Sequence, residues 1–405
     1  MVDRARPSLL PLLAVVLTAL NLRTAVTGFT PLLDVIGADL GFGPSLYGVL
    51  GTIVTASFAV FGLLAAALAR RFGLERTLAL AVALTTAGVL LRALSPSTAA
   101  LVASTVVAFT GVGASNVLVV PLVKKYFSAR LKTMSSLYIA LLQVGQFVAP
   151  LLALPVALGA GWRWAAGMWA PLTGVAVVLW VVLAVRAGGA AGAAPAGATA
   201  APVRLAGAWR TPLLWSLVLM LGMTGLNVYA VITWLPAILV DAGADPTSGG
   251  ALLALFSVFG LPAAFVVPPL AIRLRDPSVV VVVCTLCLAG GWTGLLLSPG
   301  SGAVAWVVLL GIGVSTFPLC LTLVNARTRT TAGSTVLSGA MQGLGYAIAC
   351  IGPLGIGVLY TATGSWTSSF VVLLASLVVL LVSGCVACRP SLLEDQVRAR
   401  VPVDA

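Results

Sequence analysis

Long apolar stretches of about 20 residues recur along the chain, separated by short polar or basic segments. An α-helix needs this length to cross ~30 Å of hydrocarbon. The first six stretches cover residues 9–33, 46–69, 77–94, 99–121, 133–158 and 164–185. The second six cover 211–240, 247–272, 278–297, 303–324, 336–360 and 366–388. The pattern predicts an all-α membrane protein with twelve transmembrane helices.

A segment rich in Ala, Gly and Pro separates the two sets of stretches, and its composition is typical of a flexible linker. We therefore expect an N-terminal six-helix bundle over 1–186, a cytoplasmic linker over 187–210, a C-terminal six-helix bundle over 211–388 and a cytoplasmic tail over 389–405.

The two halves also share sequence patterns at a nearly constant offset. The fourth stretch contains GVGASN at 111–116, and the tenth contains GIGVST at 311–316. Leu20-Asn21-Leu-Arg23 in the first stretch matches Leu226-Asn227-Val-Tyr229 in the seventh. These matches predict a duplicated six-helix unit with both copies in the same orientation, which gives two pseudo-symmetric bundles.

The composition narrows the class of protein further. The chain is 60% hydrophobic and only 8% charged, which excludes an ordinary soluble protein. Its net charge of +12 lies in short loops, so we expect a lipid bilayer around it and no nucleic-acid partner. The sequence has no histidine, which excludes His-based zinc sites and Ser-His-Asp triads. We expect no metal, no cofactor and no enzymatic activity.

The positions of Lys and Arg predict the orientation. If the N-terminus is cytoplasmic, nearly all basic residues fall in cytoplasmic loops, and only Arg92 and Arg163 face outward. Cytoplasmic loops of membrane proteins carry such an excess of positive charge. We therefore expect a multi-pass protein of the cell (inner) membrane with both termini in the cytoplasm. Arg23 is the exception, because it lies inside the first apolar stretch.

The six cysteines lie in the second half, and two pairs have C-x-x-C spacing. Cys284 with Cys287, and Cys385 with Cys388, could indicate a redox or metal motif. Each pair occurs in an apolar helix without polar neighbours, so core packing is the favoured interpretation.

Several runs of sequence carry a resemblance to a known family: NLRTAVTGFTPLLDVIGADLG from Asn21, SNVLVVPLVKKYF from Ser115 and TWLPAILVDAG from Thr233. With them the chain resembles the cyanate porter family of the major facilitator superfamily, which includes cyanate and 2-nitroimidazole transporters. The resemblance implies the major facilitator fold and transport of a small solute. We expect the protein to act as a monomer.

Two basic segments are candidates for gating loops. Arg70-Arg71-Phe-Gly, after the second stretch, resembles the gating motif of the superfamily, although the usual aspartate is missing and Ala69 precedes the arginines. Arg273-Leu-Arg275 occupies the corresponding place in the second half.

Arg23 is the main candidate for solute binding. An arginine within hydrocarbon costs roughly 2.5–3.5 kcal/mol by insertion scales unless a group solvates or pairs it. Asp34, the nearest acidic residue on that helix, is ~16 Å along the axis and cannot reach it. We expect the guanidinium to bind an anion or an oxygen-bearing solute in a bidentate way. The alternative is that Arg23 snorkels to the lipid headgroups.

Other polar residues could complete the site. In the superfamily, helices one, four, seven and ten line the cavity, which makes candidates of Thr27, Asn116, Asn227, Tyr229 and Thr316. Gln342 and Tyr346 form an i, i+4 pair, but such amides also join helices by hydrogen bonds. Trp234 could cap the cavity or anchor its helix at the membrane interface.

These observations together predict a secondary active or facilitative transporter that moves a small anionic or strongly polar solute by alternating access. The alternative is an exporter of a neutral, drug-like or nitroheterocyclic compound stacked on Tyr229 or Trp234. A channel is disfavoured by the duplicated halves. No acidic residue or histidine falls within a predicted span, so we expect any coupling to use a titratable solute or solute exchange.

Overall fold

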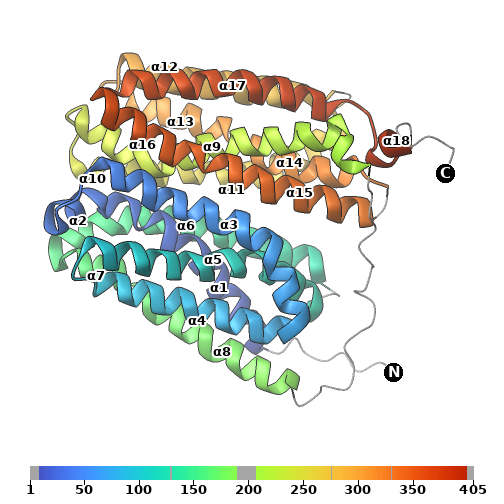
Figure 1. Ribbon diagram of the computed structural model, residues 1–405, viewed down its shortest axis with the longest axis horizontal. Coiled ribbons are helices and arrows are strands. Elements are labelled where there is room, and N and C mark those ends of the chain that lie inside the picture. The colour runs from blue at the N-terminus through green and yellow to red at the C-terminus, as the bar shows by residue number, and fades with distance from the viewer. Residues whose placement is uncertain (1–8, 128–129, 189–206, 275, 330, 399–405) are drawn as a thin grey trace. The chain divides into compact units, whose positions relative to one another are not determined.

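The computed structural model describes residues 9–127, 130–188, 207–274, 276–329 and 331–398, and within these ranges the chain forms helices without any β-strand (Figure 1). Twelve helical spans are long and apolar enough to cross a membrane, by length and composition. The predicted all-α fold class with twelve spans is thereby confirmed.

The helices of the first half are α1 (Leu9–Thr27), η1 (Thr30–Leu32), α2 (Leu33–Leu40), α3 (Pro44–Phe72), α4 (Leu74–Ala93), α5 (Thr98–Tyr126), α6 (Leu131–Ala160), α7 (Trp162–Gly167) and α8 (Ala170–Gly188). Those of the second half are η3 (Ala208–Arg210), α9 (Pro212–Asp241), α10 (Pro246–Val258), α11 (Gly260–Arg273), α12 (Ser278–Leu297), α13 (Ala303–Gly313), α14 (Thr316–Ala326), α15 (Thr331–Ala349), α16 (Ile351–Thr363), α17 (Trp366–Cys388) and α18 (Leu393–Arg398).

Prolines explain why several spans consist of two helices. A proline has no N–H for the carbonyl four residues earlier, and its ring clashes with that carbonyl. The helices α1, α7, α10 and α15 end four residues before a proline, and α13 ends five residues before one. The prolines concerned are Pro31, Pro171, Pro262, Pro353 and Pro318. Pro121, Pro150 and Pro236 lie inside unbroken helices instead.

By its internal contacts the chain divides into two compact units. Unit 1 contains residues 1–43 and 60–194, and unit 2 contains 44–59 and 195–405. Residues 44–59, the first part of α3, group with the second half of the chain, whereas the predicted bundles divide the chain at the linker. Most of the predicted linker lies outside the described residues, and the predicted tail includes the short helix α18.

Within each unit, one helix is enclosed by the others. In unit 1, α1 packs against α6, α8 and α5, and α4 packs along α5. In unit 2, α9 packs against α15, α17 and α10, and its span has the largest buried share of the twelve. Glycines allow the closest approaches, because a Cβ at Gly88 of α4 would overlap the backbone of Ala108 on α5.

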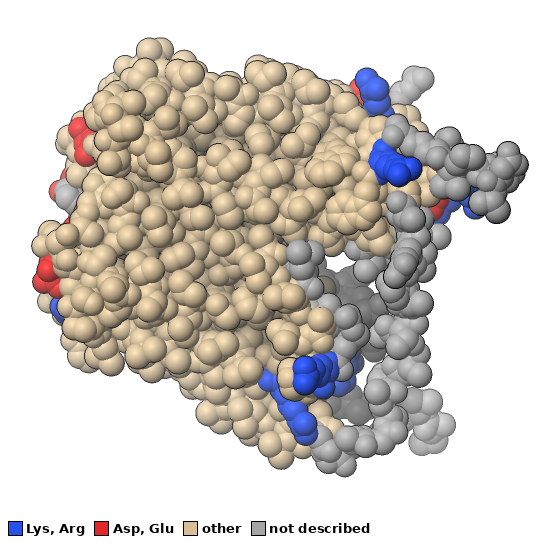
Figure 2. Space-filling model, viewed as in Figure 1, with Lys and Arg blue, Asp and Glu red and all other residues tan. Residues whose placement is uncertain are grey.

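Large apolar side chains remain exposed on the outer helices, as lipid contact requires. They include Leu80 (62% exposed), Val178 (61%) and Val378 (63%). On the face drawn in Figure 2, the middle of the surface is uncharged, and Lys, Arg, Asp and Glu lie toward its two ends. This distribution is typical of a protein surrounded by a bilayer.

Candidate solute-binding residues and gating segments

Arg23 lies on α1, one turn before that helix ends at Thr27. The side chain is half-buried, whereas every other residue of the fully described stretch 21–33 is buried. Tyr138 of α6 is also buried and interacts electrostatically with the guanidinium. This buried part of α1 therefore keeps one charged group partly accessible.

The neighbours of Arg23 on α1 use their polar atoms for local structure. Asn21 donates to the Leu17 carbonyl oxygen at 2.9 Å, and Thr24 lies within hydrogen-bond distance of the Asn21 side chain. Thr27 can donate to the Arg23 carbonyl oxygen at 3.1 Å or to the Gln146 carbonyl oxygen at 3.3 Å. Thr27 thus joins α1 to α6 close to Arg23, while its role toward a solute stays a prediction.

Asn116 lies on α5 with a half-buried side chain, and the preceding Ser115 is buried. The hydroxyl oxygen of Ser115 has no hydrogen-bond partner among the described residues. Both residues belong to unit 1, as Arg23 does. Asn116 stays a candidate for contact with a polar solute.

Three aromatic rings meet in unit 2. The Phe58 ring centroid lies 5.2 Å from that of Tyr346 and 6.4 Å from that of Tyr229, and the two tyrosines are 6.4 Å apart, edge to face. These rings come from α3, α15 and α9. Such distances suit mutual aromatic packing. The structure thus brings together two predicted residues, Tyr229 and Tyr346, with Phe58, which carried no polar signal in the sequence.

Asn227 is the centre of a hydrogen-bond network in unit 2. Its Nδ2 donates to the Met223 carbonyl oxygen at 2.9 Å and to Ser376 Oγ at 3.1 Å, and its Oδ1 accepts from Trp292 Nε1 at 2.8 Å. Asn227 is fully buried, as is Trp292. The amide therefore ties α9 to α12 and α17, which favours a structural role over the predicted contact with solute.

Two further predicted residues have polar partners within unit 2. Thr316 Oγ1 lies 2.8 Å from Thr224 Oγ1, and both side chains are fully buried. Gln342 is half-buried and donates to Ser338 Oγ at 2.9 Å on its own helix. Gln342 therefore stays more open to a solute than Thr316.

Trp234 is fully buried, so the expected anchoring at a membrane interface is wrong. Its Nε1 donates to the Pro353 carbonyl oxygen at 2.9 Å, and its ring packs edge to face on Trp366, with centroids 5.6 Å apart. Gly48 of α3 lies beside the same indole, and a Cβ there would come within 2.6 Å of the Pro353 oxygen. Trp234 thus forms part of the packing of α3 and α16 on α9.

The predicted gating arginines lie at helix ends. Arg70 and Arg71 belong to the last turn of α3, and Arg71 is exposed and lies over the Phe72 ring. Arg273 ends α11 and is exposed, while Arg275 lies outside the described residues. Gly73, which separates α3 from α4, has a φ of 88°, a value that few residues other than glycine adopt.

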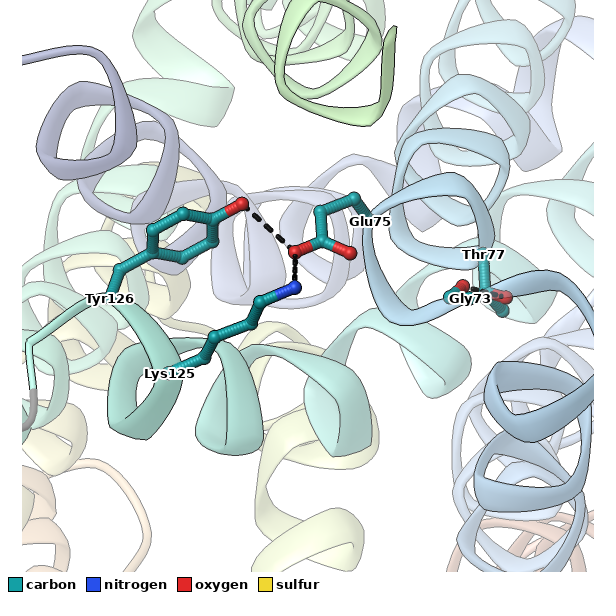
Figure 3. Close-up of polar contacts among 5 residues, drawn as sticks. All are labelled: Gly73, Glu75, Thr77, Lys125 and Tyr126. Carbon is teal, nitrogen blue, oxygen red and sulfur yellow. Dashed lines mark hydrogen bonds and ion pairs between the residues drawn. The ribbon is translucent and has the colours of Figure 1, made fainter. Parts of the chain in front are cut away.

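Glu75 follows that turn and forms a cluster that the sequence did not indicate (Figure 3). The carboxylate is buried and accepts hydrogen bonds from Lys125 Nζ at 2.5 Å and from Tyr126 Oη at 2.9 Å. Burial and this hydrogen bond to Glu75 raise the pKa of the Tyr126 phenol, which therefore stays protonated. Figure 3 also shows Thr77, which donates to the Gly73 carbonyl oxygen at 2.7 Å.

Glu75 lies just before the predicted span 77–94, and nothing in the sequence indicated that it is buried. Glu75 lies at the start of a candidate membrane span and is 5% exposed, so an acidic side chain is buried there. It fastens the first turn of α4 to the last turn of α5, and a carboxylate is favourable at a helix N-terminus. Lys125 is therefore not only one of the basic residues expected on the cytoplasmic side, because it also forms an ion pair with Glu75.

The cysteines and the acidic residues form no metal site in the described part of the chain. No group of three or more His, Cys, Asp or Glu side chains there could hold a metal ion. Cys284, Cys320 and Cys388 are buried as free thiols.

Twelve apolar helices, with polar side chains and a cation inside the spans, define a multi-pass membrane protein of the transporter class. The chain belongs to the Major Facilitator Superfamily, whose family model matches residues 13–353. It is accordingly a transporter of small-molecule solutes and not an enzyme, as the sequence predicted.

Two curated relatives and one solved structure illustrate the similarity. The 2-nitroimidazole transporter of Escherichia coli (strain K12) is 32% identical over 355 residues, covering 87% of this chain and 88% of the relative. The cyanate transport protein CynX of the same organism is 28% identical over 360 residues, covering 88% and 91%. A bacterial homologue of the human lysosomal transporter Spinster has a similar fold, with a TM-score of 0.74, 13% identity and full coverage of both chains.

Proposed function

We propose that the protein moves a small anionic or strongly polar solute across the cell membrane by alternating access, with Arg23 as the cation that the solute contacts. The observation that carries this proposal is the position of Arg23. Its side chain is half-buried on α1, which packs against α5, α6 and α8, within a stretch whose other residues are buried.

The chemistry of this position supports an oxygen-bearing or anionic solute. A guanidinium offers a planar fork of N–H donors that fits carboxylates and related planar groups. Tyr138 lies close enough to interact electrostatically with it, and Asn116 is a half-buried amide in the same unit. The name of the cyanate transport relative agrees with a small anion as the cargo.

A second candidate is export of a neutral nitroheterocycle, and a specific feature favours it. The rings of Phe58, Tyr229 and Tyr346 form an aromatic cluster in unit 2 against which a flat solute could stack. The other relative is named as a 2-nitroimidazole transporter. Under this alternative, the aromatic side chains would matter more than the charge of Arg23.

Transport by purified protein in liposomes separates the two candidates. Uptake of cyanate and of 2-nitroimidazole would be measured for the wild type and for Arg23→Gln, Arg23→Lys and Tyr229→Leu. We expect Arg23→Gln to lower anion uptake at least 100-fold, which corresponds to about 2.7 kcal/mol. Arg23→Lys should restore only part of it, because the ammonium lacks the bidentate fork.

Arg186→Gln is the matched control, because Arg186 is exposed at the end of α8 and its loss should leave uptake unchanged. Wild-type anion uptake in Arg23→Gln would refute the proposal, and loss of nitroimidazole transport in Tyr229→Leu alone would support the second candidate. A pH gradient imposed with a non-titrating solute tests the coupling, for which we expect no proton dependence.

A further inference from the structure

Arg92 is a second cation buried inside unit 1. It is the penultimate residue of α4 and only 2% exposed, although the positions of Lys and Arg in the sequence predicted that it faces outward. Its Nη1 donates to the Ala25 carbonyl oxygen on α1 at 3.1 Å. A charge buried to this extent requires compensation by its surroundings.

One edge of the guanidinium completes the end of α1. In a continuous helix, the Ala25 carbonyl would accept from the backbone N–H of Phe29. Here Phe29 donates to the Val26 carbonyl oxygen instead, at 3.3 Å, because α1 ends at Thr27. Arg92 takes the free Ala25 oxygen, and a cation is favourable at a helix C-terminus.

Two aromatic rings lie against the guanidinium. The Cζ atom lies 4.1 Å from the centroid of the Phe29 ring and 4.9 Å from that of Phe109 on α5. Such contacts attract a cation through the ring quadrupole, by about 2 kcal/mol or more where water is excluded. The rings stabilise the positive charge, but they do not accept hydrogen bonds from Nε and Nη2.

The other edge of the guanidinium has no acceptor. Nε and Nη2 of Arg92 are both buried and have no hydrogen-bond partner among the described residues. None of the three ion pairs in the described part of the chain includes Arg92. These nitrogens are adjacent on the guanidinium, and Nε–H with an Nη–H forms the fork that grips an anion with two parallel hydrogen bonds.

We propose that the Nε and Nη2 edge of Arg92 binds a small monovalent anion, either a halide or a planar oxyanion, inside unit 1. The anion supplies a negative charge, since no ion pair of the described residues includes Arg92. Arg92 contacts α1 at Ala25, which lies two residues and therefore about 200° around the helix from Arg23. The proposed site is thus separate from the predicted solute contact of Arg23, and it supports the end of α1.

Purified full-length protein tests this site through its stability. Thermal unfolding would be followed in sodium gluconate while bromide or nitrate replaces gluconate at constant ionic strength. A ligand that binds only the folded state stabilises it. We therefore expect the Tm to rise by a few degrees and to reach a plateau when the anion concentration is about 100 times its Kd. In a protein that already carries Arg23→Met, and so lacks the proposed solute contact, the added change Arg92→Met should abolish this rise, and Arg92→Lys should weaken the anion affinity at least tenfold.

Arg23→Met alone is the reference protein, and it should still respond to bromide and nitrate through Arg92. A response that is lost in Arg23→Met, or retained after Arg92→Met is added to it, would overturn the proposal, as would a wild type that does not respond. If Arg92→Met does not fold, crystals of the wild type soaked in bromide decide the question by anomalous diffraction. An anomalous peak beside Nε and Nη2 supports the site, and its absence there refutes it.

Discussion

Replacement of Asn227 by alanine tests whether this residue holds helices together or contacts the solute. The change removes two hydrogen bonds between helices, from Nδ2 to Ser376 and from Trp292 to Oδ1. It also leaves the indole N–H of Trp292 without an acceptor at a fully buried position. A net hydrogen bond contributes about 1 kcal/mol, and an unsatisfied buried donor costs about 1–3 kcal/mol. We expect Asn227→Ala to destabilise the protein by ~2–4 kcal/mol.

Asn21 provides an internal control because it occupies the matching position of the sequence repeat. Its amide makes hydrogen bonds only within α1, to Leu17 and toward Thr24, among the interactions of the described residues. Asn21→Ala therefore strands no buried partner on another helix. We expect a loss of about 1 kcal/mol, clearly smaller than for Asn227→Ala.

The assay combines unfolding with transport. Unfolding of purified variants in detergent, followed by tryptophan fluorescence, should show a larger loss for Asn227→Ala than for Asn21→Ala. In a double-mutant cycle with Trp292→Phe, the coupling energy should be about 1–2 kcal/mol. The reasoning would be refuted by an Asn227→Ala protein of unchanged stability whose KM for the solute is raised, because that result places the amide in the solute site.

Two further variants test the packing in each unit. Gly51→Val should destabilise unit 2 by about 1–3 kcal/mol, because a Cβ at Gly51 would collide with the Thr233 side chain; Gly174→Val, where the added Cβ meets open space, should be far milder in the same unfolding assay. Glu75→Gln should destabilise unit 1 through loss of its pairing with half-exposed Lys125, and a cycle with Lys125→Gln should give a coupling of no more than about 1 kcal/mol. A coupling energy of zero would show that the ion pair between Glu75 and Lys125 does not stabilise the contact of α4 with α5.

The site was partly predictable from the sequence, for reasons that particular residues make clear. Arg23 could be singled out because a cation within an apolar stretch is rare and costly, which is a one-dimensional signal. Phe58 could not, because a phenylalanine in a membrane span looks like any lipid-facing or core residue. Its position beside Tyr229 and Tyr346 depends on how α3, α9 and α15 pack.

The sequence by itself determined the twelve spans, since crossing hydrocarbon requires only a sufficient length of apolar helix. It also contains the prolines beside which five spans break, although Pro121, Pro150 and Pro236 lie inside unbroken helices. Only the tertiary structure decided which polar groups meet. Asn21 and Asn227 match in the repeat, yet one bonds within its helix and the other joins three helices. Arg92 was expected to face outward and is buried, because partners distant in sequence fix the surroundings of a side chain.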